Sequence, residues 1–278
     1  MDITFQRYVQ ATPQYQEPLD LLQRILDFQT TLADKIEPAL HIEPAVAHQK
    51  WQAGQPLFAD ESLSIPSAVF LEALTDLRPL LPTGGAVQMA LDRLLGSSLM
   101  TSSNVETLLA ELLKGDDLAA DLSAWIQRLA DDTSTHPDIM AFLLRTALCP
   151  FFEKQGAPYQ EWVETAAWRR GVCPMCGSEP RMARLTHQEG RRILACSLCH
   201  TEWTFDRLRC PFCESDGQPL LRYFTVDDDE THRVDCCDRC QRYVKTVDER
   251  VSGRPANLPV EDVITAHLDA LAWELGYQ

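Results

Sequence analysis

Paired cysteines dominate the C-terminal part of the chain. Nine of the ten cysteines lie between Cys173 and Cys240, and eight of these form C-x-x-C pairs. A C-x-x-C turn presents two thiolates to one ion, and two such pairs complete a tetrahedral four-sulfur site. The four pairs therefore predict two metal ions, the first held by Cys173, Cys176, Cys196 and Cys199 and the second by Cys210, Cys213, Cys237 and Cys240.

The spacing of the pairs supports this assignment. There are 19 residues between Cys176 and Cys196, as in zinc ribbons, and 23 between Cys213 and Cys237, which a wider hairpin can span. Four thiolates suit zinc, which is redox-silent, or a rubredoxin-like iron that exchanges one electron, and the ligands do not choose between them. Prolines stiffen the turns CPMCG and CPFCE, so that backbone N–H groups can point at the sulfurs.

Other uses of these pairs fit less well but stay open. An iron–sulfur cluster, or a metal shared between the first and third pairs, conflicts with the hairpins expected between sequential pairs. A thioredoxin-like dithiol needs a βαβ pattern that we do not find. Residues 196–200 spell the heme motif C-x-x-C-H, but that chemistry belongs to exported chains, and MDITFQRYVQ does not read as a secretory signal. A disulfide framework is a further alternative, but such frameworks are typical of short secreted domains, and we do not expect one here.

Two cysteines fall outside the pairs. Cys236 adjoins Cys237, and we interpret it as a spare thiol that packs rather than binds metal. Cys149 has no partner nearby in the sequence, and we expect a small buried hydrophobic residue. His41, His48 and His136 are isolated, and we expect surface or capping roles for them. The sequence therefore contains no catalytic constellation that we recognise.

The charge balance limits the possible partners. The chain of 278 residues has 45% hydrophobic residues and a formal net charge of −16, which argues against general nucleic-acid binding. Residues 169–209 differ, with eight arginines against four acidic residues, a net +4. This basic segment is either an ordinary solvated surface or a docking patch for an acidic partner. The sequence has no run of 18 or more apolar residues, so it predicts no membrane span.

The elements that must position the cysteines follow from periodicity. Apolar residues recur at helical spacing through residues 1–168, and Ser103 with Glu106 suggests a capping box ahead of a helix over 105–113 that ends near Gly115. After Gly171 the period shortens towards two. Strands are expected at 181–186, 191–195, 201–208, 220–226, 231–235 and 241–247, with an acidic turn at 227–230. One last helix, from Pro259 to Leu275, should pack back with His267 on its apolar face.

These residues resemble a known family. The segments CPMCGSEP, CSLCHTEW, RCPFC and CDRCQRYVKT, and the C-terminal NLPVEDVITAHLDALAWELGY, are similar to those of the formate dehydrogenase accessory proteins, FdhE. The resemblance covers residues 168–277, and the helical part matches only in general character. It implies a cytoplasmic, non-catalytic maturation factor that binds the catalytic subunit of respiratory formate dehydrogenase before export. It also implies rubredoxin-like sites, and the eight paired cysteines carry over as metal ligands.

The expected architecture is an α+β protein in four parts. We predict a helical domain (1–168), a first four-cysteine ribbon (169–208), a second (209–252) and a C-terminal helix (253–278) that packs back on the rest. The expected cofactors are two metal ions, iron or zinc. The expected partner is the formate dehydrogenase catalytic subunit, with no nucleic acid and no membrane insertion. A zinc-ribbon nucleic-acid module and a rubredoxin-like electron carrier are the alternative functions.

Overall fold

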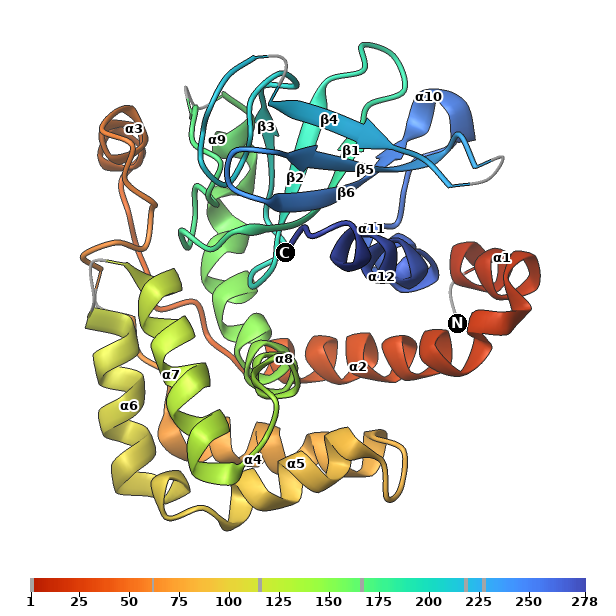
Figure 1. The fold of residues 1–278 in the computed structure, drawn as a ribbon. Coiled ribbons are helices and arrows are strands. Elements are labelled where there is room, and N and C mark those ends of the chain that lie inside the picture. Colours follow the sequence, from red (N-terminus) through yellow and green to blue (C-terminus); the bar gives the residue numbers. More distant parts are fainter. Residues whose placement is uncertain (1–2, 62, 115–116, 166–167, 218–219, 227–228) are drawn as a thin grey trace.

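A helical lower part and a β-sheet upper part make up the molecule (Figure 1). The computed structural model describes every residue except 1–2, 62, 115–116, 166–167, 218–219 and 227–228. The predicted α+β class is confirmed, with helices before the cysteine-rich segment, strands within it and helices after it. Within the described residues, no helix is both long and apolar enough to cross a membrane.

The helices of the first part pack around one central helix. Helix α8 lies against α2, α4, α5 and α7. Nearly all of its large apolar side chains are buried, because the helix has no continuous polar face that could be turned to solvent. The helices are α1 (Ile3–Ala11), α2 (Gln16–Asp34), α3 (Pro44–Gln52), α4 (Ser67–Leu77), α5 (Ala86–Gly96), α6 (Ser102–Lys114), α7 (Leu118–Thr133), α8 (Pro137–Gly156) and α9 (Gln160–Thr165).

The start of α6 differs from the expectation. The backbone N–H of Asn104 donates to the hydroxyl of Thr101, so the capping residue is Thr101, and Ser103 lies within the first turn. The Ser103 capping box was therefore wrong by two positions, because a second hydroxyl residue at the correct distance precedes it. Asp117 caps α7, because its carboxylate accepts a hydrogen bond from the N–H of Ala120. Gly115, the expected helix end, lies outside the described residues.

The six strands found among the described residues join one sheet. They are β1 (Pro180–Leu185), β2 (Arg192–Cys196), β3 (Glu202–Phe205), β4 (Leu221–Phe224), β5 (His232–Cys237) and β6 (Arg242–Asp248). Their order is β3-β2-β1-β6-β5-β4, so each four-cysteine segment contributes three antiparallel strands. The two halves meet where β1 pairs in parallel with β6. This pairing covers two strand edges that separate ribbons would leave open.

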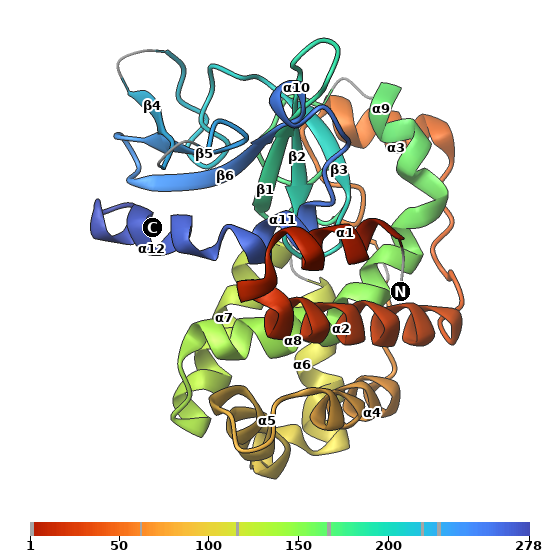
Figure 2. The same ribbon diagram turned by 90° about the vertical axis from the view of Figure 1, so that its right-hand side faces the viewer.

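The C-terminal segment forms two helices instead of the single one expected. Helix α11 (Leu258–Ile264) contacts β1 and α2, and α12 (Ala266–Glu274) lies under β5 and β6 (Figure 2). The break is at Thr265, whose hydroxyl donates to the carbonyl of Glu261 while its backbone leaves the helical range. A threonine that bonds the carbonyl four residues back bends a helix. His267 was expected in the core but is exposed and lies beside the hydroxyl of Tyr15.

Candidate metal centres

The first four-cysteine group is a closed, buried cage. The Sγ atoms of Cys173 and Cys199 are 3.6 Å apart, and those of Cys176 and Cys196 are 3.4 Å apart. A tetrahedral ion with bonds of about 2.3 Å to sulfur sets its ligands about 3.8 Å apart, so the cage needs only a slight expansion to hold one. All four cysteines are at most 4% exposed. The crossed pairing left open by the sequence is excluded, because these four thiols form one group.

The second group has the same arrangement nearer to the surface. Sulfur–sulfur distances of 3.7 Å join Cys210 to Cys240 and Cys213 to Cys237. Cys210 and Cys237 are buried, whereas Cys213 and Cys240 are only partly so. The protein therefore has two four-cysteine groups that are positioned to hold two metal ions. The donor set does not distinguish iron from zinc.

The same local backbone occurs at all four C-x-x-C turns. The residue after the second cysteine has a positive φ in each: Gly177 (77°), His200 (53°), Glu214 (55°) and Gln241 (55°). In three of the turns, the N–H of this left-handed residue closes the turn on the carbonyl of the first cysteine, as from Gly177 to Cys173 at 2.9 Å. Glycine adopts this conformation without strain, but three of the four positions use another residue. The sequence therefore gave no signal for these left-handed residues apart from Gly177.

Backbone hydrogen bonds reach the sulfurs in the proline-containing turn at Cys173, as expected, and also in the turn at Cys196, which has no proline. The N–H of Met175 points at Cys173 Sγ (3.4 Å), and the N–H groups of Leu198 and Cys199 point at Cys196 Sγ. Such donors stabilise thiolates and therefore metal binding. The hydroxyl of Thr201 lies 3.1 Å from Cys199 Sγ.

The protonation of the thiols favours ion binding in each group. Burial opposes charge on Cys176, but hydrogen bonds from the other three thiols hold its pKa well below its usual value. Burial also opposes charge on Cys213, but hydrogen bonds from Ser215, Cys210 and Cys237 together outweigh it and lower the pKa of Cys213 to about 6. Each group therefore has one thiol that is ready to ionise, and an arriving cation would displace protons from the others.

The helical part supports the first group directly, which the sequence did not predict. Beyond the end of α3, the N–H groups of Leu57 and Phe58 donate to the carbonyls of Pro174 and Met175 (2.8 and 2.9 Å). The indole N–H of Trp51 also donates to Pro174, at 2.8 Å. These three bonds fix the first C-x-x-C turn from outside its own ribbon. No periodicity in residues 51–58 indicated such a role, because the contact joins segments more than a hundred residues apart.

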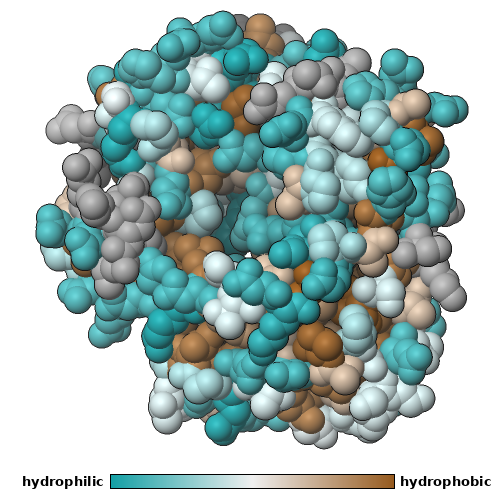
Figure 3. Space-filling model, turned by 180° about the vertical axis from the view of Figure 1, so that it is seen from behind, coloured by the Kyte–Doolittle hydropathy of each residue, from teal (hydrophilic) through white to brown (hydrophobic). Residues whose placement is uncertain are grey.

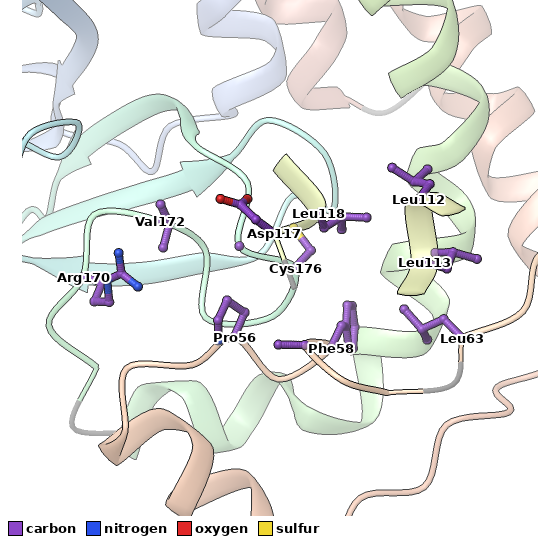
Figure 4. A pocket seen from close by; sticks show the side chains of 12 residues that line it. Pro56, Phe58, Leu63, Leu112, Leu113, Asp117, Leu118, Arg170, Val172 and Cys176 are labelled. Atoms are coloured by element: carbon purple, nitrogen blue, oxygen red, sulfur yellow. The ribbon is translucent and has the colours of Figure 1, made fainter. Parts of the chain in front are cut away.

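A small cavity lies beside the same turn. It has a volume of about 130 Å³, and Cys176 lines it together with Phe58, Leu113 and Arg170 (Figure 4). Pockets that bind small molecules usually measure about 300–1,000 Å³. This cavity is therefore too small for a substrate or an organic cofactor.

The cysteines outside the pairs behave differently from each other. Cys236 is buried against α12 with Leu268 and Ala272 and belongs to neither group, and burial raises its pKa to about 12. Its interpretation as a packing residue is confirmed. Cys149 is also buried, as expected, but it has partners: its sulfur lies 3.5 Å from His200 Nδ1, which in turn lies 2.8 Å from Glu153.

The basic segment 169–209 is largely neutralised within the fold. Arg192 is 4% exposed and pairs with Asp235 of β5, and Arg184 pairs with both Glu202 and Glu249. The arginines of this segment that form ion pairs are Arg170, Arg181, Arg184, Arg191, Arg192 and Arg209. The local excess of charge therefore serves mainly to connect the first ribbon to the second and to α11.

A larger recess lies between the two parts of the molecule. It measures about 740 Å³, which is within the range of ligand pockets. Its lining includes Leu22 and Ile25 of α2, Phe142 and Arg145 of α8, Met182 of β1 and Val263 of α11. We call this recess the interdomain groove. On the face seen from behind, hydrophobic residues form small separate patches around a hollow (Figure 3).

Comparison with known proteins tests the resemblance to the FdhE family. Residues 172–207 match the family model described as the central domain of FdhE. The resemblance to FdhE proteins is confirmed. Over 117 residues the chain is 32% identical to an FdhE homologue of Aquifex aeolicus, with 41% of each chain covered. It is 33% identical over 112 residues to FdhE of Escherichia coli, which covers 39% of this chain and 35% of that protein.

The fold likeness extends further than the sequence likeness. The crystal structure of FdhE from Pseudomonas aeruginosa matches 99% of this chain and 90% of its own, with a TM-score of 0.66 and 23% sequence identity. The helical part therefore shares the FdhE fold. The sequence alignments, in contrast, span well under half the length of the curated FdhE relatives.

Proposed function

We propose that this protein is an accessory factor for the maturation of formate dehydrogenase. We further propose that it binds the catalytic subunit of that enzyme in the cytoplasm, before export. The observation that carries the proposal is the match of residues 172–207 to the FdhE central domain, within a chain that has the FdhE fold over nearly its whole length. The division into four parts that the sequence predicts is also part of this proposal.

The metal centres support a non-catalytic role. We propose that all eight paired cysteines are ligands, four to each ion. A four-sulfur site has no open position for water or substrate, in contrast to the three-ligand sites of zinc enzymes. The bound ions would therefore hold the ribbons in shape, and the surfaces around them would do the binding.

The interdomain groove is our candidate for the partner-binding surface. Arg145 lies in it, and the structure shows no hydrogen bond or ion pair to this guanidinium among the described residues; its Nε is buried and unpartnered. Burial lowers the pKa of Arg145 but leaves it charged. The neighbouring Arg181 and Arg242 pair with Asp262 and Glu179. A carboxylate from an acidic segment of the catalytic subunit would pair directly with this guanidinium, which has no ion pair among the described residues.

Co-purification with the formate dehydrogenase catalytic subunit tests both proposals. We expect the unsubstituted protein to bind the subunit and Arg145→Ala to weaken binding by about 2 kcal/mol or more, as loss of a buried charged partner does. The control is Arg128→Ala, which removes an exposed arginine of α7.

Two outcomes contradict the proposals separately. If the unsubstituted protein does not bind the subunit, and a deletion strain oxidises formate normally, the function is wrong. If Arg145→Ala and Arg128→Ala bind equally well, the function stands but the groove is not the contact surface.

A further inference from the structure

The geometry points to a third metal site, formed by Cys149, Glu153 and His200 and separate from the two four-cysteine groups. Its donor atoms all lie within 4.8 Å of one another. Thiolate, imidazole and carboxylate together form a donor set for a borderline divalent cation such as Zn²⁺ or Co²⁺. None of the three residues belongs to a C-x-x-C pair.

Two different elements bring the donors together. Cys149 and Glu153 are four residues apart on α8 and so lie one above the other on the same face. His200 comes from the first ribbon, where its left-handed backbone (φ 53°) ends the second C-x-x-C turn. The three donor atoms thus meet at the contact between the helical part and the first ribbon. The position of His200 depends on the first four-cysteine group, because His200 directly follows Cys199 in the chain.

The distances suit one ion. A tetrahedral ion with the usual bond lengths places sulfur and nitrogen ligands about 3.6 Å apart, and nitrogen and oxygen ligands about 3.3 Å apart. Cys149 Sγ and His200 Nδ1 are 3.5 Å apart, and His200 Nδ1 and Glu153 Oε1 are 2.8 Å apart. The Glu153 carboxylate would have to withdraw by about half an ångström to fit this geometry. Its side chain is 37% exposed and has room to do so.

The same nitrogen faces both other donors. A nucleophilic triad would need the thiol and the carboxylate on opposite nitrogens of the imidazole. Here Glu153 and Cys149 both approach Nδ1 most closely, at 2.8 and 3.5 Å, while Nε2 is 3.9 Å from the sulfur. The arrangement therefore suits one ion bound at Nδ1 better than proton transfer through the ring.

The site has an open side. Cys149 and His200 both line the interdomain groove, so an ion can enter from there. Three protein ligands leave a fourth position for water, unlike the two closed cages. On binding, the Cys149 S–H bond breaks, a sulfur–metal bond forms and the proton goes to solvent.

Cobalt provides a direct test. The full chain, with zinc in both four-cysteine groups, is titrated with Co²⁺ alone. We expect one further equivalent to bind, with a thiolate-to-cobalt charge-transfer absorption that Cys149→Ser abolishes. Cys236→Ser removes the other unpaired buried thiol and should leave both uptake and absorption unchanged. Zinc retained in both four-cysteine groups shows that a variant is folded.

Glu153→Gln provides a second variant that leaves the buried thiol in place. We expect this substitution to weaken cobalt binding by about 10–100-fold or more. Losing a residue that only supports a ligand already weakens metal binding by roughly that factor, and Glu153 is proposed to bind the ion directly. Three results overturn the inference: no further equivalent of cobalt, bound cobalt without a thiolate absorption, or an absorption that persists in Cys149→Ser.

Discussion

At the scale of single residues, each sulfur is positioned by its neighbours in a short turn. In the first cage, backbone N–H groups inside each turn face the thiolates, and a left-handed residue follows each pair. The hydroxyls of Thr201 and Ser215 also lie close to a sulfur, each two residues beyond a paired cysteine. The turns therefore place four sulfurs close together before an ion binds. The electrostatic repulsion between the thiolates is offset only when the ion binds.

Cysteine-to-serine substitutions separate ligands from packing residues. We expect Cys173→Ser to lose one metal equivalent relative to the unsubstituted protein, because a hydroxyl is a poor ligand for a soft four-sulfur site. Metal analysis of the purified protein measures this loss. Cys236→Ser should retain the full complement, since Cys236 lies outside both groups. Equal metal content in the two variants would contradict the assignment of Cys173 as a ligand.

At the scale of elements, a buried carboxylate ties the C-terminal helices to the sheet. Glu261 of α11 is fully buried and pairs with His232 of β5 at 2.8 Å and with Arg254 at 3.2 Å. The hydroxyl of Tyr8, in α1, donates to the same carboxylate. Three separate segments thus meet at one side chain. Removing any one partner leaves a buried charge less compensated, which is costly.

The His232 pair gives the stability a defined pH dependence. Burial alone would lower the pKa of His232, but hydrogen bonds to Glu261 and Asp229 raise it above 6.5. The protonated pair therefore stabilises the fold fully below about pH 6.5, and this stabilisation is lost as pH rises through the raised pKa. We expect His232→Gln to reduce the free energy of unfolding more at pH 6 than at pH 9, by about 1.4 kcal/mol per unit of raised pKa.

Denaturant unfolding at the two pH values measures this difference. His41→Gln is the control, because His41 is 87% exposed. A loss of stability in His232→Gln that does not change with pH would show that the raised pKa is not what couples β5 to α11.

At the scale of the whole molecule, the two metal modules depend on each other. Beyond the shared sheet, the start of the first module lies against the third C-x-x-C turn. A Cβ atom on Gly171 would be 1.8 Å from the carbonyl oxygen of Pro211, and the N–H of Gly171 donates to Glu214. The first ribbon thus begins on the backbone of the second, and only glycine permits this approach.

Gly171→Ala should therefore destabilise the protein strongly. We expect a loss of about 3 kcal/mol or more, because backbone on both sides must move to accept the methyl group. The matched control is Gly96→Ala at the end of α5, where a Cβ would meet nothing within 4 Å. There alanine should be neutral or stabilising by about 0.5–1 kcal/mol. Thermal unfolding compares the two, and equal stability would contradict the close contact.

The sequence by itself determined the two four-cysteine groups, the strand pattern and the resemblance to FdhE. Cysteine spacing and alternation act over short stretches, so they can be read locally. It could not predict the seam between β1 and β6, the support of the first cage by Trp51, or the convergence of Cys149 with His200. Each of these joins residues at least 50 positions apart and arises only when packed surfaces meet. The break at Thr265 was missed for a related reason, since the apolar spacing continues through it. The eight cysteines were thus apparent from the chain alone, but only the tertiary structure showed that their frame is a single sheet fixed from outside by the helical part.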